Sequence, residues 1–104
     1  MAKEKLTKKQ EQLASFAKAL GHPIRVAVLQ MLVKQTHCYH GDMSEILPIA
    51  KSTLSQHLNA LKNARLIRGK ITLPNVEYCI NNKNWELAKK MFGELFIEPR
   101  RKER

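Results

Sequence analysis

The hydrophobic periodicity of this chain changes twice, and the order of the changes restricts the fold. Up to about residue 64, apolar residues recur at the three- and four-residue spacing of amphipathic helices. From 66 to 81 they alternate with polar residues, with a turn at Leu73-Pro74-Asn75, as in a β-hairpin. Helical spacing returns from 83 to 97. The sequence therefore predicts a mainly α fold with one small β-hairpin.

Capping and breaking residues place the helices along the chain. Thr7 and Gln10 form a capping box at the start of the first helix, and Pro23 suits the first turn of the second. Asp42 is a good N-cap for a short third helix, which Pro48 ends. The expected helices cover residues 7–20, 23–34, 43–47, 51–64 and 83–97.

The length and charge of the chain narrow its functions. With 104 residues, we expect one domain at 7–97 between a charged tail at 1–6 and a basic tail at 98–104. Lys and Arg number 19 against 9 Asp and Glu, and the resulting charge of +10 suits a polyanionic partner such as nucleic acid. No apolar run approaches the ~18 residues of a membrane span, and no signal-peptide pattern follows the lysine-rich start. We therefore expect a cytoplasmic protein.

The helix over 51–64 has two chemically distinct faces. Its apolar stripe is Leu54, Leu58 and Leu61, and its opposite face carries short polar side chains. A short helix, a turn and such a helix make a helix-turn-helix, and a hairpin directly after it, at 66–81, is the wing of a winged helix. The polar face could enter a DNA major groove about 12 Å wide, with Arg68 and Lys70 of the wing near phosphates or the minor groove. The alternative is an ordinary solvated face, which the order of elements and the charge disfavour.

Several motifs, in order and at the right spacing, resemble the ArsR/SmtB family of bacterial winged-helix repressors. They are A-L-G-H-P-I-R at 19–25, S-T-L-S-Q-H-L-N-A-L at 52–61, and the wing segments L-I at 66–67 and V-E-Y-C-I at 76–80. The resemblance covers most of the chain. Arg65 replaces the glycine that is common before the wing in this family, so we expect this helix end to be shaped differently.

The resemblance implies a homodimer that binds operator DNA, usually as a repressor relieved by an effector. The DNA contacts that we predict are Lys51, Ser52, Thr53, Ser55, Gln56, Asn59, Arg68 and Lys70. The resemblance also places the first and last helices in the dimer interface, where we predict contacts by Leu13, Phe16, Leu20, Trp85, Phe92 and Phe96. His57 borders the apolar stripe, so we predict a packed, hydrogen-bonded histidine and not a base contact.

The segment 35–41, a loop or a very short strand, contains Cys38, and the second cysteine of the chain, Cys79, lies in the wing. In winged helices the segment before the third helix often pairs with the second wing strand, which would make the two thiols a redox or arsenite sensor. The alternative, which we favour, is two unrelated small hydrophobic residues. If an effector exists, we expect it to act through these thiols.

No metal, cofactor or catalytic site is predicted. The last helix lacks the His and Asp ligands that some family members use, and the possible ligand types at 37–42 match no zinc signature. The sequence contains no Gly-rich phosphate loop, nucleophile elbow or paired acidic site, so we expect no enzyme. The rival function is a winged-helix module that contacts protein or RNA, for which an acidic or bulky apolar recognition face would be the sign.

Overall fold

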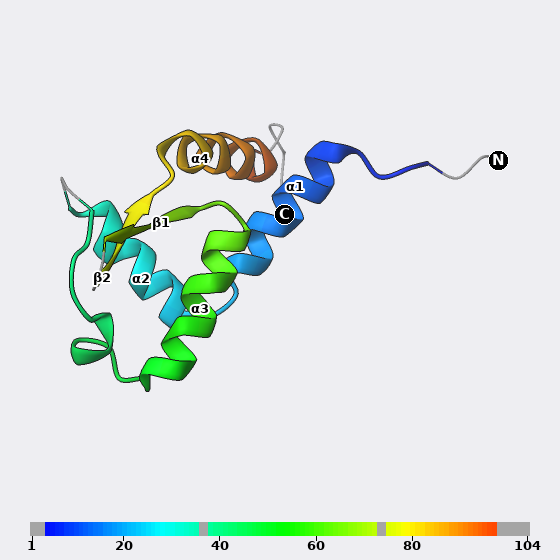
Figure 1. Cartoon of the computed structure of the whole chain (residues 1–104). Coiled ribbons are helices and arrows are strands. Elements are labelled where there is room, and N and C mark those ends of the chain that lie inside the picture. Colours follow the sequence, from blue (N-terminus) through cyan, green and yellow to red (C-terminus); the bar gives the residue numbers. More distant parts are fainter. Residues whose placement is uncertain (1–3, 36–37, 73–74, 98–104) are drawn as a thin grey trace.

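The computed structural model describes residues 4–35, 38–72 and 75–97, and its elements follow the predicted order. They are α1 (Lys8–Ala19), α2 (Pro23–Val33), the 3₁₀ helix η1 (Met43–Glu45), α3 (Lys51–Asn63), β1 (Ile67–Thr72), β2 (Asn75–Ile80) and α4 (Asn82–Phe96) (Figure 1). The mainly α fold with one hairpin is confirmed. The four α-helices begin and end within one residue of the predicted bounds.

The signals that begin α1 and α2 act as predicted. The amide of Gln10 donates to Thr7 Oγ1 at 3.0 Å, and the amide of Thr7 donates to Gln10 Oε1 at 2.8 Å, which completes the capping box. α2 begins at Pro23, and His22 Nδ1 accepts a hydrogen bond from the amide of Ile24 at 3.1 Å. Side chains thus satisfy amides that have no partner inside either helix.

The third helix is shorter than predicted. Asp42 caps it through the amide of Ser44 at 2.9 Å, but only the 3₁₀ turn Met43–Glu45 forms. The reason is that Pro48 follows closely, because proline has no amide to donate and disfavours helical backbone in the residue before it. The first helix of the helix-turn-helix is therefore a single turn, and its position depends on contacts with its neighbours.

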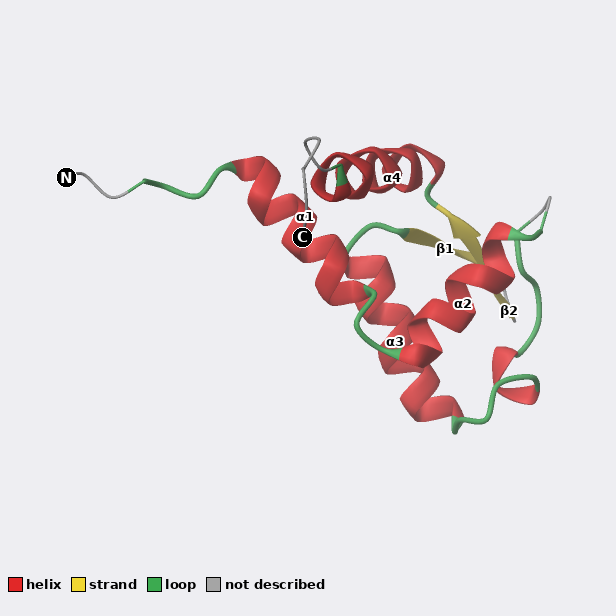
Figure 2. Ribbon diagram, turned by 180° about the vertical axis from the view of Figure 1, so that it is seen from behind, coloured by secondary structure: helices red, strands yellow, loops and turns green. Residues whose placement is uncertain are grey.

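One hydrophobic core joins the helices to the hairpin. Its largest fully buried side chains are Phe16, Val28, Leu61, Leu66 and Ile67. In both views α3 and α4 lie on opposite sides of the hairpin (Figures 1 and 2). Phe16, predicted to contact a partner, has no exposed surface in the single chain and belongs to this core.

The end of α3 corrects the expectation for Arg65. The amide of Arg65 donates to the carbonyl of Lys62 at 2.9 Å, and the amide of Leu66 donates to the carbonyl of Leu61 at 3.1 Å. This pair of bonds is a Schellman motif, and Arg65 adopts the left-handed conformation that it requires, with φ of 65°. The helix end therefore has the shape that a glycine would give, although an arginine occupies the position.

An isolated β-bridge extends the hairpin by one residue pair. β1 and β2 are antiparallel, with Ile67 opposite Ile80, and the predicted turn residues 73–74 lie outside the described residues. Tyr39 pairs with Tyr78 of β2 through two backbone hydrogen bonds of 2.7 and 3.0 Å. In the described part of the segment 35–41, for which a loop and a very short strand were both predicted, Tyr39 forms this one bridge; residues 36–37 lie outside the description.

Within the described ranges, no helix is both long and apolar enough to cross a membrane.

Candidate nucleic-acid interface

The two predicted faces of α3 are present in the structure. Leu54, Leu58 and Leu61 are buried in the core. The side chains predicted to contact DNA from this helix are exposed, namely Lys51, Ser52, Thr53, Ser55, Gln56 and Asn59. A row of short side chains that can donate and accept hydrogen bonds is thus held on the outer face of a helix that the core anchors.

His57 fastens α3 to α2. Its side chain is buried, and its Nδ1 accepts a hydrogen bond from Arg25 Nε at 3.0 Å. The His22 ring lies against it, with ring centroids 4.2 Å apart. The prediction of a packed, hydrogen-bonded histidine is confirmed. Burial lowers the pKa of His57, and the nearby His22 and Arg25 lower it further.

This buried histidine predicts a stability that depends on pH. Because the pKa of His57 is lower in the folded chain than its ordinary 6.5, the unfolded chain binds the proton more readily. The contribution of His57 to stability is therefore complete above pH 6.5 and is lost as the pH falls through the folded pKa. We expect the free energy of unfolding, measured by urea titration at constant protein concentration, to fall below this pH.

His57→Gln should weaken this pH dependence, because glutamine can accept the bond from Arg25 without titrating. His40→Gln is the matched control, since the His40 side chain is 65% exposed, and it should keep the loss at low pH. An unchanged slope in His57→Gln would contradict the assignment.

A salt bridge joins the two helices of the helix-turn-helix. Lys51 Nζ, at the start of α3, lies 2.9 Å from Asp42 Oδ2, at the cap of η1. The Ser44 hydroxyl bonded to the carboxylate, together with Lys51, lowers the pKa of Asp42 to about 2, and Asp42 in turn raises the pKa of Lys51. The charge of Lys51, one of the predicted DNA contacts, thus already has a partner within the fold.

Arg68 of the wing lies beside a cysteine of the neighbouring strand. Arg68 of β1 is exposed and lies directly opposite Cys79 of β2 in the sheet register. Side chains at opposite positions of an antiparallel pair lie on the same face of the sheet. The backbone of Lys70 continues β1, but its side chain lies outside the described residues.

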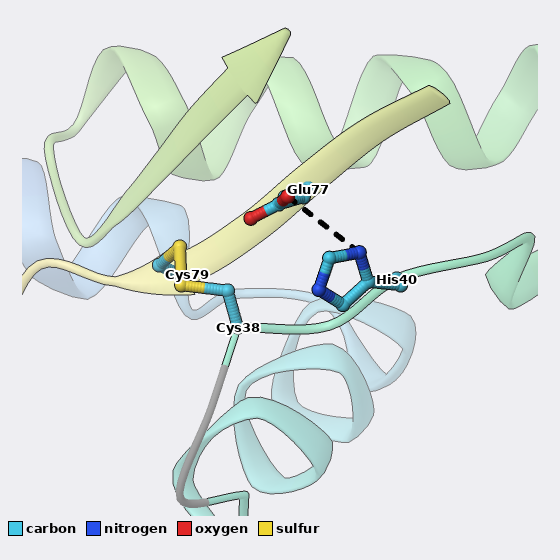
Figure 3. Close-up of a disulfide and its surroundings, with 4 residues drawn as sticks. All are labelled: Cys38, His40, Glu77 and Cys79. Atoms are coloured by element: carbon cyan, nitrogen blue, oxygen red, sulfur yellow. Dashed lines mark ion pairs between the residues drawn. A yellow bond between two sulfur atoms is a disulfide. The ribbon is translucent and has the colours of Figure 1, made fainter. Parts of the chain in front are cut away.

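Cys38 and Cys79 form a disulfide, with Cα atoms 4.5 Å apart (Figure 3). The interpretation as unrelated hydrophobic residues, which we favoured, is wrong. The antiparallel bridge of Tyr39 with Tyr78 places the two cysteines opposite each other, and on its other side His40 Nδ1 lies 3.6 Å from Glu77 Oε1. Sequence reasoning missed this ion pair, although the pairing of the segment with the second wing strand predicts it at the same register.

The disulfide also bears on the ligand types at 37–42. The sulfur of Cys38 is in the disulfide, so in this form it is not a thiolate that could bind a metal. His37 lies outside the described residues. Within the described part of the chain, no three His, Cys, Asp or Glu side chains gather as a metal site would require.

The predicted dimer-contact residues other than Phe16 keep exposed surface. Leu13, Leu20, Trp85 and Phe92 are half-buried, and Phe96 is 72% exposed. The end of α4 also exposes Leu95 and Ile97, which the prediction missed. An apolar pocket of about 220 Å³ is lined by residues of α2 and its C-cap together with Leu20 and Trp85, the latter at the start of α4.

Comparison with known proteins agrees with this geometry. A sequence model of the family described as "Bacterial regulatory protein, arsR family" matches residues 22–68. The HTH-type transcriptional regulator YgaV of Escherichia coli is 32% identical over 73 residues, which are 70% of this chain and 74% of YgaV. This chain belongs to the ArsR family. It is therefore a DNA-binding transcription regulator with a winged helix-turn-helix fold.

Other relatives of this ArsR-family regulator support the same fold. The biofilm growth-associated repressor of Xylella fastidiosa is 26% identical over 78 residues, which are 75% of this chain and 68% of the repressor. HlyU from Vibrio cholerae superposes with a TM-score of 0.69 at 22% identity, over 89% of this chain and 100% of HlyU. The ArsR-family regulator RHA00566 superposes with a TM-score of 0.71 at 21% identity, over 91% and 92% of the two chains.

Proposed function

We propose that this ArsR-family regulator is a homodimeric repressor that binds a pseudo-palindromic operator with α3 in the major groove. The observation that carries the proposal is the exposed polar face of α3, opposite leucines buried in the core. The chain charge of +10 supplies attraction to phosphates, and Arg68 on the wing is exposed, so we expect it to contact the DNA backbone or the minor groove. The Xylella relative is itself named a repressor.

The attachment of α3 to its neighbouring elements supports the proposal that its polar face recognises DNA bases. Base edges are distinguished by hydrogen bonds from side chains whose position on the groove is set by contacts elsewhere. The Arg25–His57 bond holds α3 against α2, and the Lys51–Asp42 pair holds its start against η1. Ser55 and Gln56 therefore project from a helix that is fastened at two places.

The proposed dimer forms through the exposed apolar surfaces of α1 and α4. Half-buried Trp85 and Phe92 and exposed Phe96 provide more apolar surface than a terminal helix of a small domain needs. A two-fold dimer would present two α3 helices to half-sites about one helical turn, ~10 bp, apart.

Binding to the promoter of the protein's own gene tests the proposal. Fluorescence anisotropy with a labelled duplex should show specific binding above that to a scrambled duplex of the same composition. Gln56→Ala should reduce this specificity by roughly 5–150-fold for a lost bidentate base contact, and Ser55→Ala, which removes a single hydroxyl, should reduce it less. Gln12→Ala, the same change at an exposed position of α1, is the control. If both α3 variants keep full specificity, the recognition face is wrong, and stronger binding to RNA would favour the rival module.

The oligomeric state is tested separately by analytical ultracentrifugation. We expect a dimer at micromolar concentration, and Phe96→Glu should shift it toward monomer because a charge would be buried in the interface. Ile46→Glu is the control, since Ile46 is similarly exposed, at 62%, but lies beside η1. A stable, monodisperse monomer of the wild-type protein would overturn the proposed dimer.

We further propose that an effector acts through the disulfide pair and not through α4. The disulfide joins the segment before η1 to β2 of the wing, so it links the helix-turn-helix to the wing, both of which we propose to contact DNA. Making or breaking it can therefore change how η1 and α3 sit relative to the wing.

A further inference from the structure

A cavity of about 350 Å³ opens against the disulfide. Cys38 and Cys79 both line it, together with Arg68, Gln35, Asn82 and Trp85. Cys38 is half-buried, whereas Cys79 is only 7% exposed, so a molecule in the cavity has access to the bond mainly through Cys38. Its volume lies within the usual range of small-molecule sites, roughly 300–1,000 Å³.

The lining of this cavity favours an anion. Among the described residues that line it, Arg68 alone carries a formal charge, and Gln35 and Asn82 add side-chain amides. Glu77, the nearest acidic residue on β2, does not line the cavity and is paired with His40 at 3.6 Å. A guanidinium beside amides is a good partner for a carboxylate or a sulfonate.

We infer that this cavity binds a small anionic thiol, which docks its acidic group on Arg68 and opens the disulfide by exchange. The role of this exchange in resetting the regulator rests on the proposed function. The exchange reaction itself does not depend on that function. The ligand class is a low-molecular-weight thiol that carries a carboxylate or a sulfonate. Both the bond that it attacks and the charge that it requires lie on the same cavity wall.

The exchange is balanced in two steps. The thiolate of the first ligand attacks Cys38 Sγ, the Cys38–Cys79 bond breaks, and Cys79 leaves as a thiolate. A second ligand thiolate then attacks the ligand sulfur of the mixed disulfide and releases Cys38 as a thiolate. Two thiol ligands are thereby oxidised to one disulfide, and the protein disulfide is reduced to two thiols that take up protons from solvent.

Three thiols of different charge test the inference on the oxidised protein without DNA. They are 2-mercaptoethanesulfonate (anionic), 2-mercaptoethanol (neutral) and cysteamine (cationic). Acid quenching, alkylation and mass spectrometry would measure the intact disulfide and the mixed disulfide over time. Each rate is divided by the rate at which the same thiol reduces an uncharged peptide disulfide. We expect the anionic thiol to exceed the neutral one by about fivefold, and the cationic thiol to be slowest.

Substitutions of Arg68 locate the effect. Arg68→Gln should remove the preference for the anionic thiol and leave the normalised rate of the neutral thiol unchanged, whereas Arg68→Lys should keep part of the preference. Lys90→Gln, which removes a positive charge from α4, should keep all of it. Circular dichroism would confirm that the variants are folded.

Three results would overturn the inference. They are equal normalised rates for the three thiols, an equal slowing of all three by Arg68→Gln, or a wild-type protein that keeps two free thiols after air oxidation. Since no DNA is present in this assay, failure of the proposed function at the operator would leave these rates unaffected, and the two failures are distinguishable.

Discussion

Raising the salt concentration from ~50 to ~200 mM should weaken binding of the protein to duplex DNA by about 10³–10⁵-fold, as when 6–10 phosphates are contacted. The physical reason is release of the cations condensed on DNA when lysine and arginine side chains replace them. The chain carries a formal charge of +10, and a dimer would double it. Anisotropy titrations at several salt concentrations give the slope of log affinity against log salt.

Arg68→Ala should weaken binding to all DNA sequences alike. It should also reduce the slope of log affinity against log salt by ~0.9 for each wing that loses a phosphate contact. Lys83→Ala is the matched control, because Lys83 is exposed and belongs to α4, the helix that lies on the other side of the hairpin from α3 (Figure 1). An affinity that does not change with salt, or an equal effect of the two substitutions, would contradict a phosphate contact by the wing.

Oxidation of Cys38 and Cys79 should lower the affinity for the operator by about 5–150-fold, the range of an ordinary allosteric coupling. The disulfide ties the segment before η1 to β2, and we expect this tie to restrict adjustments of η1 and α3 during groove binding. Anisotropy with oxidised protein and with protein held reduced would measure the difference. Arsenite, which can bridge the two reduced thiols, should imitate oxidation.

Cys38→Ser separates this switch from packing. The variant should bind the operator as reduced wild-type protein does, and neither oxidant nor arsenite should release it. Cys79→Ser should behave alike, although Cys79 is more buried and its stability needs a separate urea titration. Equal release of DNA from wild type and Cys38→Ser would leave the cysteines with a role in packing only.

Local signals in the sequence were sufficient to predict most of the secondary structure. The Thr7–Gln10 capping box, Pro23 at the start of α2 and the change of periodicity at the hairpin all act between residues that are close in the chain. The two faces of α3 follow from the same short-range spacing. The capping signal at Asp42 was correct as well, but the helix after it is one turn, because Pro48 limits it more closely than predicted.

Backbone conformation at Arg65 shows where residue identity misleads. Positive φ is unfavourable for a residue other than glycine. Arginine at position 65 therefore indicated a helix end shaped differently from that of relatives with glycine there. The structure holds Arg65 at φ of 65° because Leu66 must enter the core directly after α3. Burial of an apolar side chain thus outweighs the local preference of the residue before it.

The sequence by itself determined the order of the elements, the polar face of α3 and the positive charge of the chain. Only the tertiary structure decided which distant residues meet. Cys38 and Cys79 are 41 residues apart in the chain, and Arg25 and His57 are 32 apart. The burial of Phe16, predicted to face a partner, was decided in the same way. The physical reason is that helix caps and periodicity depend on neighbours within a few residues, whereas these contacts depend on how helices and strands pack around one core.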